Sequence, residues 1–154
     1  MKKMEKVDSK EVGLEIGLLL TRFFFNSEDL HFGYWPDGTP TDMSTISKAQ
    51  TNHSNLIFSH IPDGVKNILD VGSGSGELAK KLIDKGYSVD CVSPSSFLSD
   101  TIQSKLPPQS TLYRTTLEDL ESDHRYDLII FSESFQYVNI QSGLSKCAHL
   151  LKHH

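Results

Sequence analysis

One segment constrains the fold of this chain more than any other. Residues 68–77 read Ile-Leu-Asp-Val-Gly-Ser-Gly-Ser-Gly-Glu. The apolar residues at the start are typical of a strand buried on both faces of a parallel sheet. Three alternate glycines, Gly72, Gly74 and Gly76, then let the backbone turn sharply and approach a ligand with no Cβ in the way. Apolar residues at helical spacing follow over residues 78–83. The segment therefore predicts a strand, a glycine turn and a helix, which together are the setting of a nucleotide-type cofactor site.

The glycine spacing discriminates between cofactors. A dinucleotide-binding turn needs a third glycine where this chain has Glu77. The pattern D-x-G-x-G-x-G, which begins at Asp70, instead resembles motif I of the class I S-adenosylmethionine (SAM)-dependent methyltransferases. The resemblance implies that Asp70 helps to hold the methionine amino group and that the loop with Ser73 lies against SAM. A glycine turn that binds no ligand is the alternative, and it is disfavoured because the acid, the glycines and the flanking periodicity agree.

Length, charge and cysteine content limit the class of protein. The 154 residues are enough for one sizeable core. The net charge of −5 and the absence of long Lys or Arg runs disfavour a nucleic-acid partner. We expect no signal peptide and no membrane partner, because charged and polar residues interrupt the apolar stretch 14–25, which we interpret as a core-packing helix. Cys91 and Cys147 lack metal-ligand spacing and indicate buried thiols of a cytoplasmic protein.

Periodicity also predicts the order of the elements. Two N-terminal helices, the first with Ser9 as its N-cap, precede four strands and a last helix, at residues 9–25, 44–60, 67–71, 88–92, 111–115, 127–131 and 140–152. Further helices separate the first three strands. The resemblance implies an α/β, Rossmann-like three-layer sandwich with a mostly parallel sheet of order 3-2-1-4, truncated after the fourth strand. We divide the chain into a helical cap with a SAM lid segment, residues 1–62, and the first half of the SAM-binding core, residues 63–154.

Ligands of open α/β sheets bind beyond the carboxyl ends of the strands. The resemblance places cofactor contacts there: Ser93 and Pro94 near the ribose, Thr116 and Leu117 near the adenine, and Ser132 near the methionine end. Most family members carry an acid at the positions of Ser93 and Thr116, so these two contacts are expected to be weaker. Asp90 lies three residues before Ser93 and on the opposite face of its strand, which favours a role within the sheet.

An aromatic segment upstream is the second landmark. Residues 31–35 read His-Phe-Gly-Tyr-Trp and resemble the segment that folds over SAM in methyltransferases of sugars, tocopherols and glycine-type amines. The resemblance implies that Tyr34 reaches the methionine carboxylate. An aromatic face beside a sulfonium also gains about 0.5 to 2 kcal/mol of cation–π attraction. The alternative is an aromatic staple that packs the N-terminal helices, and motif I downstream favours the cofactor role.

The catalytic base is the least determined part of the site. Related small-molecule enzymes often carry histidines at the positions of Gln136 and Tyr137, and this chain has neither. Tyr137, Glu133 and His31 are the remaining candidates, although amines and acidic phenols need no base. The spacing of the histidines along the sequence predicts no metal site. The residues concerned are His31, His53, His60, His124 and His149.

These observations predict a SAM-dependent methyltransferase that acts on an O, N or C atom of a small molecule. A pseudoenzyme that binds SAM or S-adenosylhomocysteine without turnover is the alternative. A nicotinamide-dependent oxidoreductase is disfavoured by Glu77. An unpaired fourth strand would also present apolar residues at the sheet edge, so we expect self-association through that edge.

Overall fold

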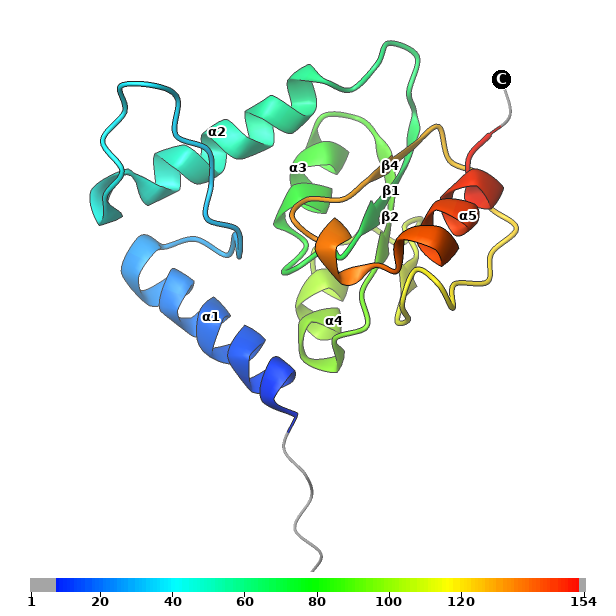
Figure 1. Ribbon diagram of the computed structural model, residues 1–154, viewed down its shortest axis with the longest axis horizontal. Helices are drawn as coiled ribbons and strands as arrows, with labels where there is room; N and C mark the ends of the chain where they lie inside the picture. The colour runs from blue at the N-terminus through cyan, green and yellow to red at the C-terminus, as the bar shows by residue number, and fades with distance from the viewer. Residues whose placement is uncertain (1–7, 153–154) are drawn as a thin grey trace, which may run out of the picture.

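A four-stranded parallel sheet forms the centre of the computed structural model, which describes residues 8–152 (Figure 1). Its strands lie in the order β3-β2-β1-β4, with bounds β1 Asn67–Val71, β2 Ser88–Val92, β3 Leu112–Tyr113 and β4 Leu128–Ile130. All three pairings are parallel. The predicted strand order is therefore confirmed.

Helices cover both faces of this sheet, as Figure 1 shows. On one face lie α3 (Glu77–Asp84) and α4 (Ser96–Gln103), whose buried leucines pack against Ile68, Val89 and Ile130. On the other face lies α5 (Ile140–Leu150), which packs against Leu69, Val71 and Val92. Alternate residues of β1 and β2 thus serve two separate cores, which makes the domain a three-layer sandwich.

Helix α1 (Ser9–Phe25) has the predicted bounds, but its cap and its packing differ from the prediction. Asp8 is the N-cap and accepts a hydrogen bond from the Lys10 amide, so Ser9 is the first helical residue. Leu18 is the one fully buried apolar side chain of α1, whereas Phe23 is 82% exposed. The interpretation as a core-packing helix is therefore wrong for most of its apolar residues. The helix contacts mainly α4, and among residues 8–152 nothing covers its opposite side.

Glu11 anchors α1 to α4. Its carboxylate accepts hydrogen bonds from the Ser95 hydroxyl at 3.0 Å and from the Phe97 amide at 2.9 Å. These groups lie at the N-terminus of α4, where backbone amides lack intrahelical partners and the helix dipole favours an acid.

Several predicted elements are shorter in the structure. The predicted second helix begins as a 3₁₀ turn, Met43–Thr45, which a capping box with Asp42 stabilises, and continues as α2 (Ile46–Ser59). Strands β3 and β4 keep only two and three residues, because each pairs with one neighbour at a sheet edge. Helix α5 ends at Leu150, since Leu151 turns to bridge with Tyr126 beside the sheet. Among residues 8–152, no helix is both long and apolar enough to span a membrane.

Candidate functional site

The glycine loop follows β1 directly, and its three glycines have positive φ angles of 72°, 54° and 84°. A Cβ at Gly72 would lie 2.5 Å from the Cβ of Ser134, and a Cβ at Gly76 would lie 3.2 Å from the Cα of Ile102. These two glycines are therefore needed for packing. A Cβ at Gly74 would have only a Leu30 methyl group nearby, at 3.8 Å. Gly74 thus leaves open backbone that a ligand can approach.

Asp70 lies at the end of β1, immediately before this loop, and is fully buried. Neither of its carboxylate oxygens has a hydrogen-bond partner within residues 8–152. Burial raises the pKa of this carboxyl to about 7. Because a buried polar group without a partner is costly, such a group in a native fold calls for a reason. The protonated amino group at the methionine end of SAM would supply both missing donors and a compensating charge, so Asp70 fits that cofactor.

Residues 28–30 lie against the glycine loop. The Ser75 hydroxyl donates to the Glu28 carbonyl at 2.5 Å, and Lys105 forms ion pairs with both Glu28 and Glu77. The side chain of Leu30 is the group nearest to Gly74. Residues 28–30, which directly precede the aromatic segment 31–35, are therefore tied to the loop by a hydrogen bond and by ion pairs.

The aromatic residues of this segment lie over α2. The Tyr34 amide donates to the Ala49 carbonyl at 2.9 Å, and the Trp35 indole donates to the Thr45 hydroxyl at 2.9 Å. A Cβ at Gly33 would lie only 2.6 Å from the Ala49 carbonyl carbon, so glycine is required there. The Tyr34 side chain is 43% exposed, and its contact with the methionine carboxylate stays a prediction.

The predicted ribose and adenine contacts lie at neighbouring strand ends. Ser93, which is buried, and Pro94 follow β2, where the Val92 carbonyl accepts hydrogen bonds from the loop amides of Gly72 and Ser73. The Thr116 hydroxyl donates to Asp119 at 2.9 Å. Leu117 is 2% exposed and belongs to the core under α5. The roles of these residues toward a cofactor stay predictions.

The segment after β4 contains Ser132, Glu133, Ser134 and Tyr137. The Ser134 hydroxyl donates to the Val71 carbonyl at 2.5 Å, which places this segment directly beside the glycine loop. Glu133 has a positive φ of 59°, a backbone conformation that is strained for a residue with a Cβ. Tyr137 lies in a 3₁₀ turn (Phe135–Tyr137) and is 82% exposed.

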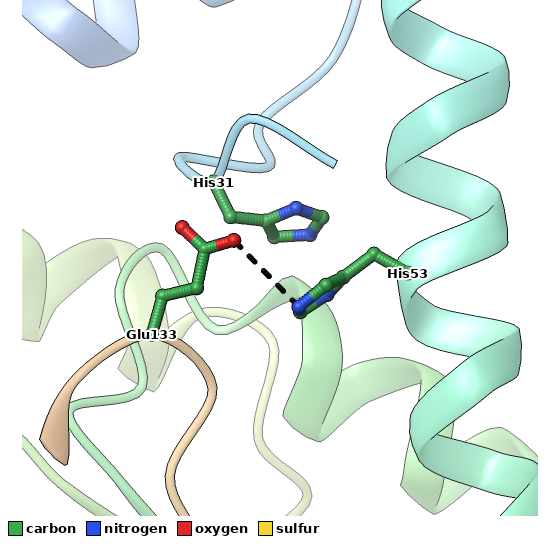
Figure 2. Close-up of side chains that lie close together, drawn as sticks. All are labelled: His31, His53 and Glu133. Atoms are coloured by element: carbon green, nitrogen blue, oxygen red, sulfur yellow. Dashed lines mark ion pairs between the residues drawn. The ribbon is translucent and has the colours of Figure 1, made fainter. Parts of the chain in front are cut away.

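Two of the three catalytic candidates come together, and a third residue joins them (Figure 2). His31 and His53 lie with ring centroids 4.2 Å apart, and the Nε2 atom of His53 is 3.7 Å from a carboxylate oxygen of Glu133. Sequence spacing missed His53 because the three residues come from three distant segments. Its position on α2 could have indicated that His53 points inward. His53 comes three residues after the buried Gln50 and four residues after the buried Ala49, so the three lie on one face of the helix.

Comparison with known proteins agrees with this geometry. The family described as "methyltransferase domain" matches residues 68–154, more than half of the chain. A ubiquinone biosynthesis O-methyltransferase of Rickettsia felis is 30% identical over 149 residues, which are 90% of this chain and 54% of that protein. A putative methyltransferase of Geobacillus sp. is 32% identical over 129 residues, which are 79% of this chain and 52% of that protein. The chain thus spans about half the length of these relatives.

Solved structures share the fold. StiE O-MT matches with a TM-score of 0.62 at 14% identity, over 92% of this chain and 56% of that one. The glycopeptide N-methyltransferase MtfA, complexed with SAM, matches with a TM-score of 0.58 at 15% identity, over 66% of this chain and 50% of that one. Together with the family match and the glycine loop that follows Asp70, these likenesses show that the chain belongs to the class I SAM-dependent methyltransferase family.

Proposed function

We propose that this chain binds SAM beside its glycine loop and serves the transfer of the methyl group to an O, N or C atom of a small molecule. The observation that carries the proposal is the buried, unpartnered carboxylate of Asp70 next to the open backbone of Gly74. When bound, SAM supplies a methyl group activated by the adjacent sulfonium. Asp70 would hold the amino group, Tyr34 the carboxylate, and Ser93 with Pro94 the ribose.

The chain's own contribution to the rate would be position and the exclusion of water. Residues 28–30 and the segment after β4 both lie against the loop, so they would enclose the methionine end of the cofactor. His31 and Glu133 remain candidate proton acceptors, since they lie together beside this end. Tyr137 is a weaker candidate because its side chain is exposed.

A small-molecule acceptor is supported by the similarity to a ubiquinone biosynthesis O-methyltransferase. The alternative is a protein that holds SAM or S-adenosylhomocysteine without turnover. Two observations favour it: Thr116 is engaged by Asp119, and no acid follows β2. We also propose a cytoplasmic location, because Cys91 and Cys147 are free thiols.

Calorimetric titration with SAM, S-adenosylhomocysteine and NAD tests the cofactor. Asp70→Ala should weaken SAM binding by about 1.5 to 3 kcal/mol, the usual contribution of a hydrogen bond to a charged partner. Gly74→Val should abolish binding, because its side chain would occupy the space open to the ligand. Asp63→Ala, at an exposed loop position, is the matched control and should bind as the wild type does.

Equal SAM binding by the wild type and both site variants would contradict the proposal, and NAD binding would favour an oxidoreductase instead. A methylation assay with a metabolite extract then separates an enzyme from a protein that only holds SAM.

The edge of β4 leads us to propose a second copy of the chain as a partner. Strand β4 and the end of α2 line an apolar groove of about 500 Å³ with Leu56, Ile57, His60, Ile61, Leu128, Ile129 and Ile130. Such an edge favours pairing with another strand. Light scattering should show dimers of the 154-residue chain that Leu56→Lys dissociates. A monomer at every concentration would exclude this partner.

A further inference from the structure

Three segments that are far apart in the sequence bring His31, His53 and Glu133 together. Figure 2 shows His31 on the loop after α1, His53 on α2 and Glu133 on the loop after β4, with their side chains directed toward one another. One potential ligand atom from each residue lies within 4.8 Å of the other two. The cluster therefore joins the loop after α1, helix α2 and the loop after β4.

The packing around the two histidines holds them in place. The Gln50 side-chain amide donates to the backbone carbonyls of both Asp29 and His31, at 3.0 and 3.1 Å. The His31 and His53 side chains are only 11% and 16% exposed. The Gln50 amide thus holds the backbone of His31, and the two rings are largely buried rather than mobile surface groups.

The ring nitrogens have capacity left for a ligand. The Nδ1 atoms of both histidines are buried and have no hydrogen-bond partner within residues 8–152. Burial, together with the neighbouring His31, lowers the pKa of His53, so its ring is neutral at neutral pH and keeps a lone pair for bonding. A buried polar atom without a partner is costly, and an ion bound through an Nδ1 atom would remove that cost for its ring.

The charges around the cluster favour a cation. Glu133 provides one negative charge, and the Asp29 carboxylate lies 3.5 Å from the Nε2 atom of His31. Lys81 pairs with Asp29 at 2.8 Å and offsets one of these charges. Glu133, Asp29 and Lys81 together carry one net negative charge. Carboxylates next to a ligating histidine are also typical of metal sites, where they orient the ring.

We propose that His31, His53 and Glu133 bind one divalent transition-metal ion of the zinc type. Two imidazoles and one carboxylate are a ligand set that suits zinc and its neighbours in the first row, and hard cations such as Mg²⁺ prefer oxygen ligands alone. Tetrahedral bonds of about 2.0 to 2.2 Å place ligand atoms about 3.4 Å apart. His53 and Glu133 are already close to this separation at 3.7 Å, and the remaining ligand atoms need a shift of little more than 1 Å from at most 4.8 Å.

The strained backbone at Glu133 is an independent observation that fits this role. A positive φ is strained for a residue with a Cβ, and strained residues of this kind cluster at functional sites. Three protein ligands leave a fourth position open for water or another ligand. The inference goes beyond the proposed function, because metal binding requires neither SAM nor an acceptor.

Calorimetry on the EDTA-treated full chain tests the site, with Zn²⁺, Co²⁺ and Mg²⁺ as probes. The chain used for all arms carries His153→Ala and His154→Ala, so that the terminal histidine pair cannot contribute. We expect one Zn²⁺ per chain, a raised melting temperature, the visible absorption bands of four-coordinate Co²⁺, and no binding of Mg²⁺.

Variants locate the ion. His31→Ala and His53→Ala should each weaken Zn²⁺ binding more than about a hundredfold, since losing a direct ligand costs more than losing the groups that orient it. Glu133→Gln, at a partly exposed position, should weaken binding without a risk to folding. His60→Ala, at an exposed histidine at the end of α2, is the matched control and should leave binding unchanged.

Equal Zn²⁺ binding by the wild type and the His31, His53 and Glu133 variants would overturn the proposal, as would no Zn²⁺ binding at micromolar concentration. Circular dichroism of each variant shows whether it is folded, and Glu133→Gln decides the matter where a histidine variant is not. Asp70→Ala should keep full Zn²⁺ affinity, so a failure of the SAM assignment and a failure of the metal site give different results.

Discussion

Two buried aspartates lie on adjacent central strands of the sheet, Asp70 on β1 and Asp90 on β2, and their surroundings are opposite. The Asp90 carboxylate accepts hydrogen bonds from the Thr111 amide at 2.6 Å and from the Tyr126 hydroxyl at 2.8 Å. The Asp70 carboxylate accepts none from residues 8–152. One acid therefore has its partners within the fold, and the other lacks them.

This difference separates a structural role from a ligand-binding one. Asp90 links β2 to Thr111, which directly precedes β3, and to Tyr126, which lies shortly before β4. It therefore stabilises the arrangement of three neighbouring segments. Asp70 reduces the stability of the protein, because burial of a charge without a partner is unfavourable. A fold keeps such a group where a ligand provides the missing partner, which is the role that the glycine loop also indicates.

The largest effect should come from removing the partnered acid. Asp90→Ala deletes two hydrogen bonds to a charged group, and it leaves the buried Tyr126 hydroxyl with only the Tyr113 hydroxyl as a partner, at 3.4 Å. We expect the free energy of unfolding to fall by about 3 to 6 kcal/mol, at about 1.5 to 3 kcal/mol for each bond. Urea denaturation followed by circular dichroism measures the change.

Asp70→Ala is the matched comparison for that experiment. At pH 8 it should leave the free energy of unfolding unchanged or raise it, because it removes a buried charge that has no partner. If the two variants were equally destabilised, the distinction between the acids would fail.

The pH dependence of stability sharpens the comparison further. Burial raises the pKa of Asp70 from 3.8 to about 7, so between these values the folded protein holds a proton that the unfolded chain releases. Its contribution to the free energy of unfolding therefore falls as the pH rises through this window, by about 1.4 kcal/mol per pH unit. From pH 5 to pH 7 the wild type should lose about 2 kcal/mol relative to Asp70→Asn, in which this proton is absent. Denaturation of both proteins at several pH values measures the difference, and parallel curves would show that the carboxyl is not buried as described.

The sequence predicted the central strands well because their signal is local. The run that contains Asp70 is apolar on both sides and ends in glycines, so the bounds of β1 and β2 matched the prediction. The edge strands β3 and β4 were predicted too long, because the extent of pairing depends on the neighbouring strand and not on apolar content alone. The exposure of Phe23 depends likewise on what packs against α1.

The candidate site likewise has a part that is set by local sequence and a part that is set by tertiary packing. The glycine loop could be identified because its residues are contiguous in the sequence, and the lid role of residues 31–35 stays a prediction. His53 could not, since its contact with Glu133 spans α2, the sheet and the loop after β4. The contrast between Asp70 and Asp90 was anticipated only in part: alternation along β2 indicated a sheet role for Asp90, but the partners Thr111 and Tyr126 are set by tertiary packing.

The smallest effect concerns Ser73, whose hydroxyl group is hydrogen-bonded to the backbone of Asp70. Its Oγ atom donates to the backbone carbonyl of Asp70 at 2.8 Å and so leaves the carboxylate oxygens free. Ser73→Ala should therefore reduce the free energy of unfolding by only about 1 kcal/mol, the net contribution of one neutral hydrogen bond. It should change SAM affinity less than tenfold, because the carboxylate keeps its position and its missing donors. If Ser73→Ala weakened SAM binding as strongly as Asp70→Ala, the hydroxyl and not the carboxylate would be the main contact of the cofactor, and the contrast between the two aspartates would no longer explain how this chain binds its ligand.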